Sequence, residues 1–368
     1  METILTISAI AALILGLTAL AELVWKRFRR LVPRWKTGID RLEEGVDRLA
    51  EYLDGLLTAS NETLRAAYEE ARRLQLAAYQ AQSSEKHQDA IDGFTKALSL
   101  AESDAQRDAL HVLRANSYWC TSDHDKARAD YEQALNLSKR ISSLEEATHA
   151  RAAALAGLGL VYADQGDLDR AEQHHKEALK IHRQIGDLVG QANQLSNLGT
   201  VYGRRGDLDR AKQHLQQALG THRRIGNSLG EAAALGNLGS VYAQRGDLDR
   251  AEQHYKHSFD IHRRVCDPLG QARDLSGLGN VYRQRSDLDR AEQHHKQALD
   301  IHREIGDRLG QANQLANLGL LAEQRADLRQ SQDLLRQALA IYEKIGAGGK
   351  GPDAVRRALA LIEEKKRQ

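Results

Sequence analysis

The apolar residues of this chain recur with the spacing of amphipathic helices. Within residues 187–226, Leu195, Leu198 and Tyr202 lie three and four residues apart. This spacing places the three side chains on one face of a helix. A second series with the same kind of spacing begins at Leu208. The segment therefore predicts two helices, each with one apolar face.

The residues between the two series predict where one helix ends and the next begins. Gly206 can adopt the left-handed conformation that commonly follows the end of a helix. Asp207 can cap the helix that follows. We therefore expect the first helix to end near Arg205 and the second to start after Asp207. Together they form an antiparallel hairpin that cannot bury its apolar side alone.

The same pattern recurs about every forty residues, which predicts an array of stacked units. We expect the array to cover residues 67–346 in about seven helix-turn-helix repeats. Residues 352–368 are expected to form a final amphipathic helix that caps it. The expected repeats lie near residues 69–103, 106–140, 147–186, 187–226, 227–266, 267–306 and 307–346.

One motif in these repeats resembles a known family. The pattern LGxVYxxRGDLDRAExHxxxAL, at residues 158–179, 198–219 and 278–299, resembles the tetratricopeptide repeat, and the forty-residue length resembles kinesin light chain and Pins-type arrays. The resemblance implies an all-α, right-handed superhelix. It also implies that the first helix of each repeat lines a concave groove, where a protein or peptide ligand binds.

Polar residues occupy the face of each first helix that lies away from the apolar series. Carboxamides both donate and accept hydrogen bonds, which suits the backbone of an extended peptide. The alternative is a face that is only solvated, and Gly157 and Gly277 interrupt the row of asparagines. The expected groove residues are Asn193, Asn197, Arg204, Asn237, Gln244, Arg273, Asn280, Gln284, Asn313 and Asn317.

The start of the chain differs from the repeats, because no charged residue occurs from Ile4 to Ala21. At about 1.5 Å per residue this stretch spans about 27 Å, close to the thickness of a bilayer core. A cluster of Lys and Arg follows within residues 26–36, and such clusters stay on the cytoplasmic side. We therefore expect residues 1–25 to form a single transmembrane signal-anchor helix, with membrane contact through residues 4–25.

This expectation makes the chain a single-pass protein of the cell (plasma or inner) membrane. The N-terminus would lie outside, residues 26–36 would form a basic juxtamembrane segment, and the repeats would be cytoplasmic. The alternative is a cleavable signal peptide, with Ala19-Leu20-Ala21 as its cleavage site. The missing basic segment before the apolar stretch and the dense basic cluster after it favour the anchor.

Residues 37–66 are expected to form a stalk. Apolar residues at 39–56 alternate three and four apart, as in the seam of a short coiled coil. Self-association into a homo-oligomer through this seam is one interpretation. The other is an amphipathic helix that lies on the membrane or on the first repeat.

Composition and motifs argue against several classes of function. The chain has 52 basic and 51 acidic residues, so its total charge gives no sign of nucleic-acid binding. The two cysteines, Cys120 and Cys266, lie in different repeats, which fits a reducing compartment. No phosphate-binding loop, nucleophile elbow or CxxC motif occurs. We therefore expect neither an enzyme nor a cofactor.

Histidines and aspartates recur in the second helix of the repeats. Equivalent residues in stacked repeats lie about 10 Å apart, too far to share a metal ion. We therefore interpret the histidines as packing residues rather than a metal site or a pH sensor. The recurring Asp-Leu-Asp-Arg, as at 207–210, is interpreted as a helix start. The repeated histidines are His174, His214, His254 and His294, and His182, His222, His262 and His302.

These observations together predict a membrane-anchored scaffold whose cytoplasmic repeats recruit a partner protein or peptide into a concave groove. A homo-oligomeric, membrane-associated structural assembly is the first alternative. A regulatory or sensor subunit of a separate effector enzyme is the second. The sequence does not identify the partner.

Overall fold

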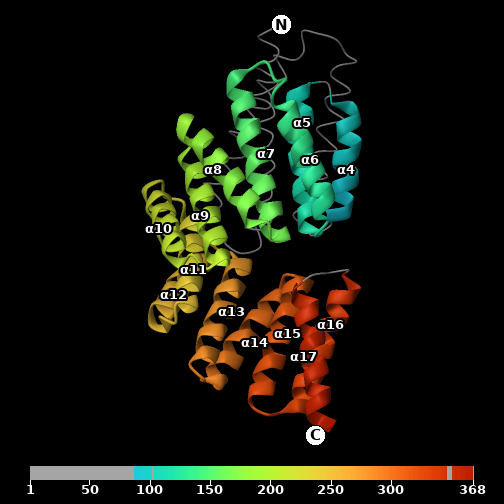
Figure 1. Cartoon of the computed structure of the whole chain (residues 1–368), viewed down its shortest axis with the longest axis vertical. Helices are drawn as coiled ribbons and strands as arrows, with labels where there is room; N and C mark the ends of the chain where they lie inside the picture. The colour runs from blue at the N-terminus through green and yellow to red at the C-terminus, as the bar shows by residue number, and fades with distance from the viewer. Residues whose placement is uncertain (1–86, 102, 346–349, 368) are drawn as a thin grey trace, which may run out of the picture. The chain divides into compact units, whose positions relative to one another are not determined.

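The computed structural model describes residues 87–101, 103–345 and 350–367, and in these residues the chain forms fourteen α-helices and no strand (Figure 1). The all-α class and the stacked helix hairpins are therefore confirmed, whereas the handedness and the path of the whole array remain predictions. The helices are α4 (His87–Leu100), α5 (Asp104–Cys120), α6 (His124–Leu137), α7 (Leu144–Gln165), α8 (Leu168–Gln184), α9 (Leu188–Arg205), α10 (Leu208–Arg224), α11 (Ser228–Gln244), α12 (Leu248–Arg264), α13 (Pro268–Gln284), α14 (Leu288–Glu304), α15 (Arg308–Gln324), α16 (Leu328–Lys344) and α17 (Lys350–Arg367).

The hairpin of α9 and α10 shows how local sequence sets the helix ends. The Asp187 side chain accepts a hydrogen bond from the Gly190 N–H at 2.9 Å and so caps the start of α9. The helix ends at Arg205, and Gly206 has a left-handed φ of 86°. Asp207 then caps α10 by accepting from the Arg210 N–H at 3.1 Å. The ends expected from the sequence are thus confirmed in this repeat.

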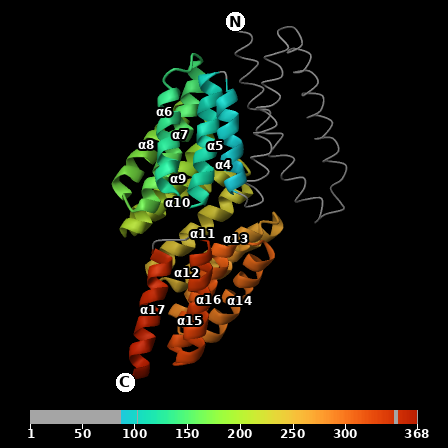
Figure 2. The same ribbon diagram turned by 90° about the vertical axis from the view of Figure 1, so that its right-hand side faces the viewer.

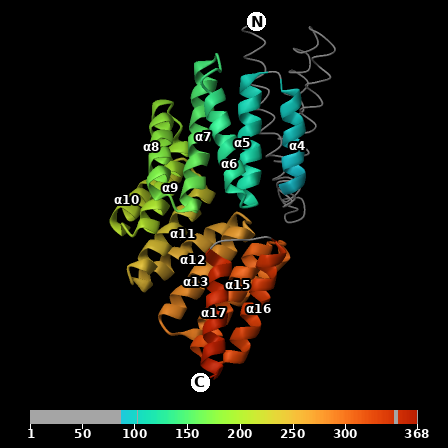
Figure 3. The ribbon, with the colours of Figure 1, turned by 45° about the vertical axis from the view of Figure 1, so that its right-hand side comes forward.

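The chain divides into two compact units, Met1–Ile181 and His182–Gln368. In the first unit, α4, α5, α6 and α7 lie side by side (Figure 3). Asp130 of α6 is buried there and accepts hydrogen bonds from Arg114 at 2.7 Å. The indole N–H of Trp119 donates to Asp164 of α7 at 2.8 Å. The Arg114–Asp130 contact lies within the second expected repeat, and the Trp119–Asp164 contact joins that repeat to the first helix of the third.

In the second unit, arginines at the ends of first helices fix how successive hairpins stack. Arg285, just after α13, contacts Asp249 at 2.5 Å and also pairs with Glu252, both on the second helix of the preceding repeat. Glu252 also accepts a hydrogen bond from the Tyr282 hydroxyl at 2.6 Å. Arg325 repeats this contact with Asp289. The pairs link each hairpin to the previous one at a defined register.

The last helices of this unit, α15, α16 and α17, lie side by side (Figure 2). Val355 and Ile362 of α17 are buried, and Lys365 pairs with Glu323 of α15 at 2.7 Å. The α17 helix therefore covers the apolar side that the last hairpin would otherwise expose.

Glycine lets the first helix of one repeat approach the second helix of the preceding repeat closely. A Cβ on Gly277 of α13 would lie 2.4 Å from Cε1 of Tyr255, whereas a Cβ on Gly220 of α10 would meet nothing within 4 Å. Gly277 therefore has no room for a side chain, and Gly220 does.

These two glycines give opposite predictions. Gly277→Ala is expected to lower the free energy of unfolding by about 1–2 kcal/mol, because the clash with Tyr255 outweighs the better helix propensity of alanine. Gly220→Ala is expected to raise it by about 0.5–1 kcal/mol, because only the propensity changes. Urea denaturation followed by circular dichroism measures both. Changes of the same sign in the two variants would contradict the packing described for α12 and α13.

The expected single-pass membrane localisation is not supported, and we correct it. Among the residues that the structure describes, no helix is both long enough and apolar enough to cross a bilayer. The 22-residue α7, for example, has Arg151 near its middle, besides Glu145, Glu146 and Asp164 in its end turns, and a charged residue at the centre of a bilayer costs about 3 kcal/mol.

Several expected segments lie outside the described residues. They are the membrane helix at 1–25, the basic segment at 26–36, the stalk at 37–66 with its seam at 39–56, and the first helix of the first repeat. The expected domain boundaries therefore remain predictions.

Candidate functional site

All ten residues expected to line the groove are accessible to solvent. Six are exposed and four are half-buried. They lie on the first helices of four successive repeats. Asn193, Asn197 and Arg204 are on α9, Asn237 and Gln244 on α11, Arg273, Asn280 and Gln284 on α13, and Asn313 and Asn317 on α15.

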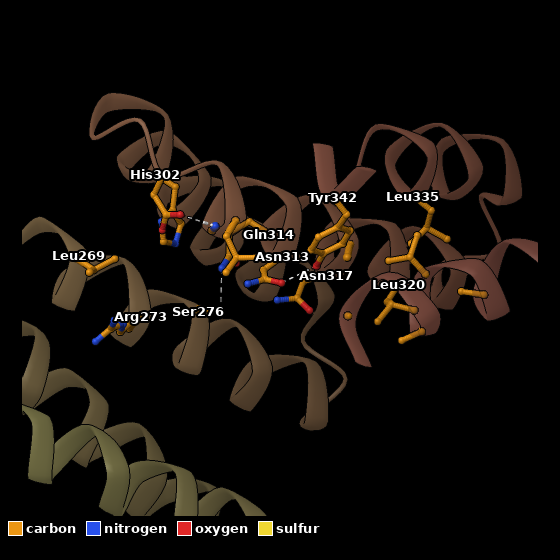
Figure 4. A pocket seen from close by; sticks show the side chains of 18 residues that line it. Leu269, Arg273, Ser276, His302, Asn313, Gln314, Asn317, Leu320, Leu335 and Tyr342 are labelled. Carbon is orange, nitrogen blue, oxygen red and sulfur yellow. Dashed lines mark hydrogen bonds and ion pairs between the residues drawn. The ribbon is translucent and has the colours of Figure 1, made fainter. Parts of the chain in front are cut away.

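Three of these residues meet in a pocket of about 580 Å³ in the second unit. Arg273 of α13 and Asn313 and Asn317 of α15 line it together with residues of α16 and α17. In Figure 4 the amide side chains lie between Arg273 at one end and Leu320 at the other. The other seven expected residues do not line this pocket. They lie on the same helices or on α9 and α11.

The amides of the pocket have capacity left for a ligand. The Tyr342 hydroxyl donates to Asn313 Oδ1 at 2.5 Å, which fixes the orientation of this amide. Within the described part of the chain, neither the Nδ2 of Asn313 nor the side chain of Asn317 forms a hydrogen bond. Two Asn side chains thus present unused donors, and one of them an unused acceptor, to the cavity.

A buried amide forms part of the pocket wall behind Asn313. Gln314 Nε2 donates to Ser276 Oγ at 3.1 Å, and Gln314 Oε1 lies 2.9 Å from His295 Nδ1. Burial lowers the pKa of His295 to about 4, so this histidine is neutral at physiological pH and its Nδ1–H donates to Gln314. The network connects α13, α14 and α15 behind the accessible amides.

Sequence reasoning missed Gln314, Tyr342 and the α17 residues of this site. Gln314 occupies a position on the apolar face of α15, four residues before Leu318, and a polar residue on an apolar face was the available signal. Nothing in the repeat pattern indicates that Gly351, Ala354 and Ala358 of α17 would line the cavity. The position of α17 is decided by its packing against α16.

Both sets of repeated histidines have packing positions, as the sequence analysis expected. His182, His222, His262 and His302 are buried. Each faces the first turn of the following helix: a Cβ on Gly310, for instance, would lie 2.1 Å from His302 Nδ1. The other set is half-buried and stacks on tyrosines of the preceding helix, with ring centroids 5.1–5.3 Å apart.

His302 lies next to Asp307, and both residues line the pocket. Its Nδ1 lies 2.8 Å from Asp307 Oδ2, and Asp307 caps α15 by accepting from the Gly310 N–H at 2.8 Å. Burial opposes ionisation of Asp307, but the His302 contact and the Gly310 hydrogen bond together hold its pKa below the usual value. The Asp307 carboxylate is therefore already engaged by the protein.

A buried group of Ser258, His262 and Asp274 has the composition of a catalytic triad without its geometry. Asp274 Oδ2 lies 2.7 Å and Ser258 Oγ 3.5 Å from the same nitrogen, His262 Nδ1. A triad needs the two partners on different nitrogens of the ring. Ser258 is also fully buried and donates to the Ala232 carbonyl at 2.8 Å. The group therefore connects α11, α12 and α13 and has no route to a substrate.

Among the described residues, no group of three or more His, Cys, Asp or Glu side chains could hold a metal ion. The pocket lining offers hydrogen bonding from amides, one guanidinium, the Asp307 carboxylate and apolar contact.

Comparisons with known proteins agree with the helix hairpins. A family model described as the tetratricopeptide repeat matches residues 106–184, 149–224, 190–264 and 270–344. No match is found among curated protein sequences. The finer resemblance to kinesin light chain and Pins-type arrays is not tested by these matches and remains a prediction.

Several solved structures share the fold at low sequence identity. The apo form of RapI is 17% identical, with a TM-score of 0.60 over 76% of this chain and 100% of RapI. A Rap protein complexed with Competence and Sporulation Factor is 14% identical, with a TM-score of 0.62 over 94% and 98%. Aspartyl phosphate phosphatase F from Bacillus subtilis is 11% identical, with a TM-score of 0.63 over 88% of each chain. At these identities the likeness shows the fold alone.

Proposed function

Since the chain belongs to the tetratricopeptide repeat family, we propose that it is a scaffold that binds an extended segment of a partner protein along the first helices of its repeats. Repeats of this family are typically interaction modules without a catalytic site. The observation that carries the proposal is the pocket in which Arg273, Asn313 and Asn317 meet. The contact surface extends from there along α13, α11 and α9.

The hydrogen-bonding capacity of this surface supports a peptide ligand. An extended backbone presents N–H and C=O groups in alternation, and an Asn or Gln side chain can satisfy either. Asn237 and Asn280 are half-buried on α11 and α13, and no described residue forms a hydrogen bond with their side chains. Amides that the protein leaves unpaired on successive repeats suit a backbone that passes across them.

The structural neighbours are consistent with this use of the fold. One of them is a Rap protein in complex with Competence and Sporulation Factor. This provides an example of the fold holding a ligand.

The test is a cross-linked pull-down from cell lysate with the full chain. Changing Asn237, Asn313 and Asn317 together to Asp is expected to reduce recovery of the partner at least about tenfold, because each Asp lacks the donors that a peptide carbonyl needs. Circular dichroism confirms that the variant folds, as expected for accessible positions.

The matched control is Gln216→Glu with Gln217→Glu on α10. These two amides are exposed on a second helix, and the change adds the same kind of charge. Recovery by the control variant should equal that of the parent chain. If the Asn variant also recovers the partner fully, the proposed binding surface is wrong.

A further inference from the structure

An apolar residue stands at the same place in four successive first helices. It is the second residue of α9, α11, α13 and α15, next to the N-cap turn. Three of the four side chains are 46–52% exposed, and the fourth is half-buried. We call these residues the apolar row. They are Val189, Leu229, Leu269 and Leu309.

The apolar row belongs to the face that the proposed function assigns to the ligand. Leu269 and Leu309 line the same pocket as Arg273 and Asn313. Each lies four residues before one of these polar residues, and residues four apart lie on the same face of a helix. Val189 and Leu229 have the same relation to the corresponding positions of α9 and α11. The face therefore has an apolar margin beside its polar residues.

Recurrence separates the apolar row from ordinary exposed hydrophobic residues. Single exposed leucines are normal on protein surfaces, and Leu144, Ile345 and Leu361 are such cases in this chain. Exposure of an apolar side chain at the same position of four repeats costs solvation free energy four times over, and two of the four side chains line the pocket. Such an arrangement is typical of a surface that is covered in a complex.

The spacing of the apolar row sets the spacing of its ligand. The first helices α9 and α11 contact each other, as do α11 and α13. Packed helices lie about 8–10 Å apart, so Val189, Leu229 and Leu269 on these three helices are expected to follow one another at about this distance. A polyproline II segment advances about 3.1 Å per residue with three residues per turn, which brings every third side chain to the same side after about 9.3 Å.

We propose that the groove recognises a partner segment in an extended, polyproline II-like conformation with an apolar side chain at every third residue. This inference rests on the proposed function and deepens it. A β-strand brings its side chains to the same side about every 6.6 Å and does not match the row. A helix matches at every seventh residue, about 10.5 Å, but its backbone groups are already paired and would leave the amides of the groove unused.

The charges of the groove favour an uncharged or acidic segment. The accessible polar positions on the four first helices include Arg204 and Arg273, and none of the ten is an Asp or Glu. The carboxylate of Asp307 in the pocket is already next to His302. Asp307 is the one carboxylate in the pocket lining and lies near both His302 and the charge of Arg273, so a lysine of the segment would have to compete with these groups for it.

The test uses labelled synthetic peptides and the full chain. Each peptide has about 24 residues, the same composition of Leu, Ser, Gln and Asp, and four leucines spaced two, three or seven residues apart. Fluorescence anisotropy is expected to show at least about tenfold tighter binding for the spacing of three than for either other spacing. Equal affinities, or tightest binding at a spacing of two or seven, would overturn the inference, as would no binding by any peptide.

Variants of the apolar row complete the test. Changing Val189, Leu229 and Leu309 together to Ser is expected to abolish the preference for the spacing of three. Changing the exposed Leu144, Ile345 and Leu361 to Ser is the matched control and should leave it intact. A preference that survives in the row variant would overturn the inference.

The pull-down with the triple Asn variant tests the proposed function independently of the peptide experiment. A partner that is captured through Asn237, Asn313 and Asn317 without any preference for leucine spacing leaves the proposed function standing and rejects only the three-residue spacing. Capture that does not depend on these residues rejects both.

Discussion

A His295→Leu variant is expected to keep, at about pH 4, about 3 kcal/mol of unfolding free energy that the parent chain loses on acidification. His295 is fully buried on α14, and its Nδ1 lies 2.9 Å from Gln314 Oε1. Burial lowers its pKa from 6.5 to about 4 in the folded protein. The side chain must therefore charge in a site that favours its neutral form.

The sign follows from proton binding. Between about pH 4 and pH 6.5 the unfolded chain holds a proton on this histidine that the folded chain does not. The contribution of the neutral, buried side chain to stability is complete above pH 6.5 and declines as the pH falls through this window. A leucine at the same position does not titrate, so the variant lacks this part of the decline.

The chain itself indicates that a leucine fits there. Leu215 of α10 occupies the equivalent position two repeats, or eighty residues, before His295. It is buried. Urea denaturation at about pH 7.5 and about pH 4 measures the effect. Near pH 7.5 the two proteins should differ by only about 1 kcal/mol, since one hydrogen bond to Gln314 is lost. Equal acid sensitivity of parent and variant would show that His295 is not the group that titrates.

Tyr202→Ala is expected to lower the free energy of unfolding by about 3–5 kcal/mol. The Tyr202 ring is 2% exposed. It stacks on His214 with centroids 5.3 Å apart and an interplanar angle of 4°, while the Arg210 guanidinium lies 4.9 Å from the centroid of the Tyr202 ring. Removing the ring leaves a cavity between α9 and α10 and deprives both partners of their contact.

Two further variants separate the ring from the hydroxyl and from its partners. Tyr202→Phe keeps the stack and should cost about 1 kcal/mol or less. In the last repeat the equivalents of Tyr202, His214 and Arg210 are Ala322, Leu334 and Gln330, so the three change together. His214→Leu should therefore cost less in the Tyr202→Ala background than in the parent chain.

Hydrogen exchange locates the effect of Tyr202→Ala. Amides of α9 and α10 should lose protection first, because in a repeat array each hairpin is stabilised mainly by its neighbours. Uniform loss of protection across α9 to α16 would contradict this local account. Loss of protection confined to α9 and α10 would also show that the backbone of α9 is held in place by the Tyr202–His214 stack.

Much of the fold could be predicted from the sequence because its determinants are local. The period of 3.6 residues places Leu195, Leu198 and Tyr202 on one face whatever their neighbours are. Gly206 and Asp207 end one helix and start the next through their own backbone and side-chain groups. The same local reasoning put the ten polar residues on accessible faces, although it did not establish what binds there.

The membrane expectation shows the limit of a local pattern. An uncharged stretch at residues 4–21 predicts a membrane helix by hydropathy alone. Residues 4–21 lie outside the described part of the chain, and in that part no helix is able to cross a bilayer, which contradicts the expected single-pass localisation.

The candidate site itself was decided by the tertiary structure. Arg273 lies forty residues before Asn313, and only the packing of α13, α15 and α17 brings their side chains to one cavity. The inward positions of Gln314 and Tyr342 depend on the same packing.

The sequence by itself thus determined the hairpins, their caps and the side of each helix that faces solvent, because spacing along one helix fixes these. Only the tertiary structure decided which of those residues share a pocket. That outcome depends on crossing angles and side-chain volumes across several helices, which no periodicity within one helix specifies.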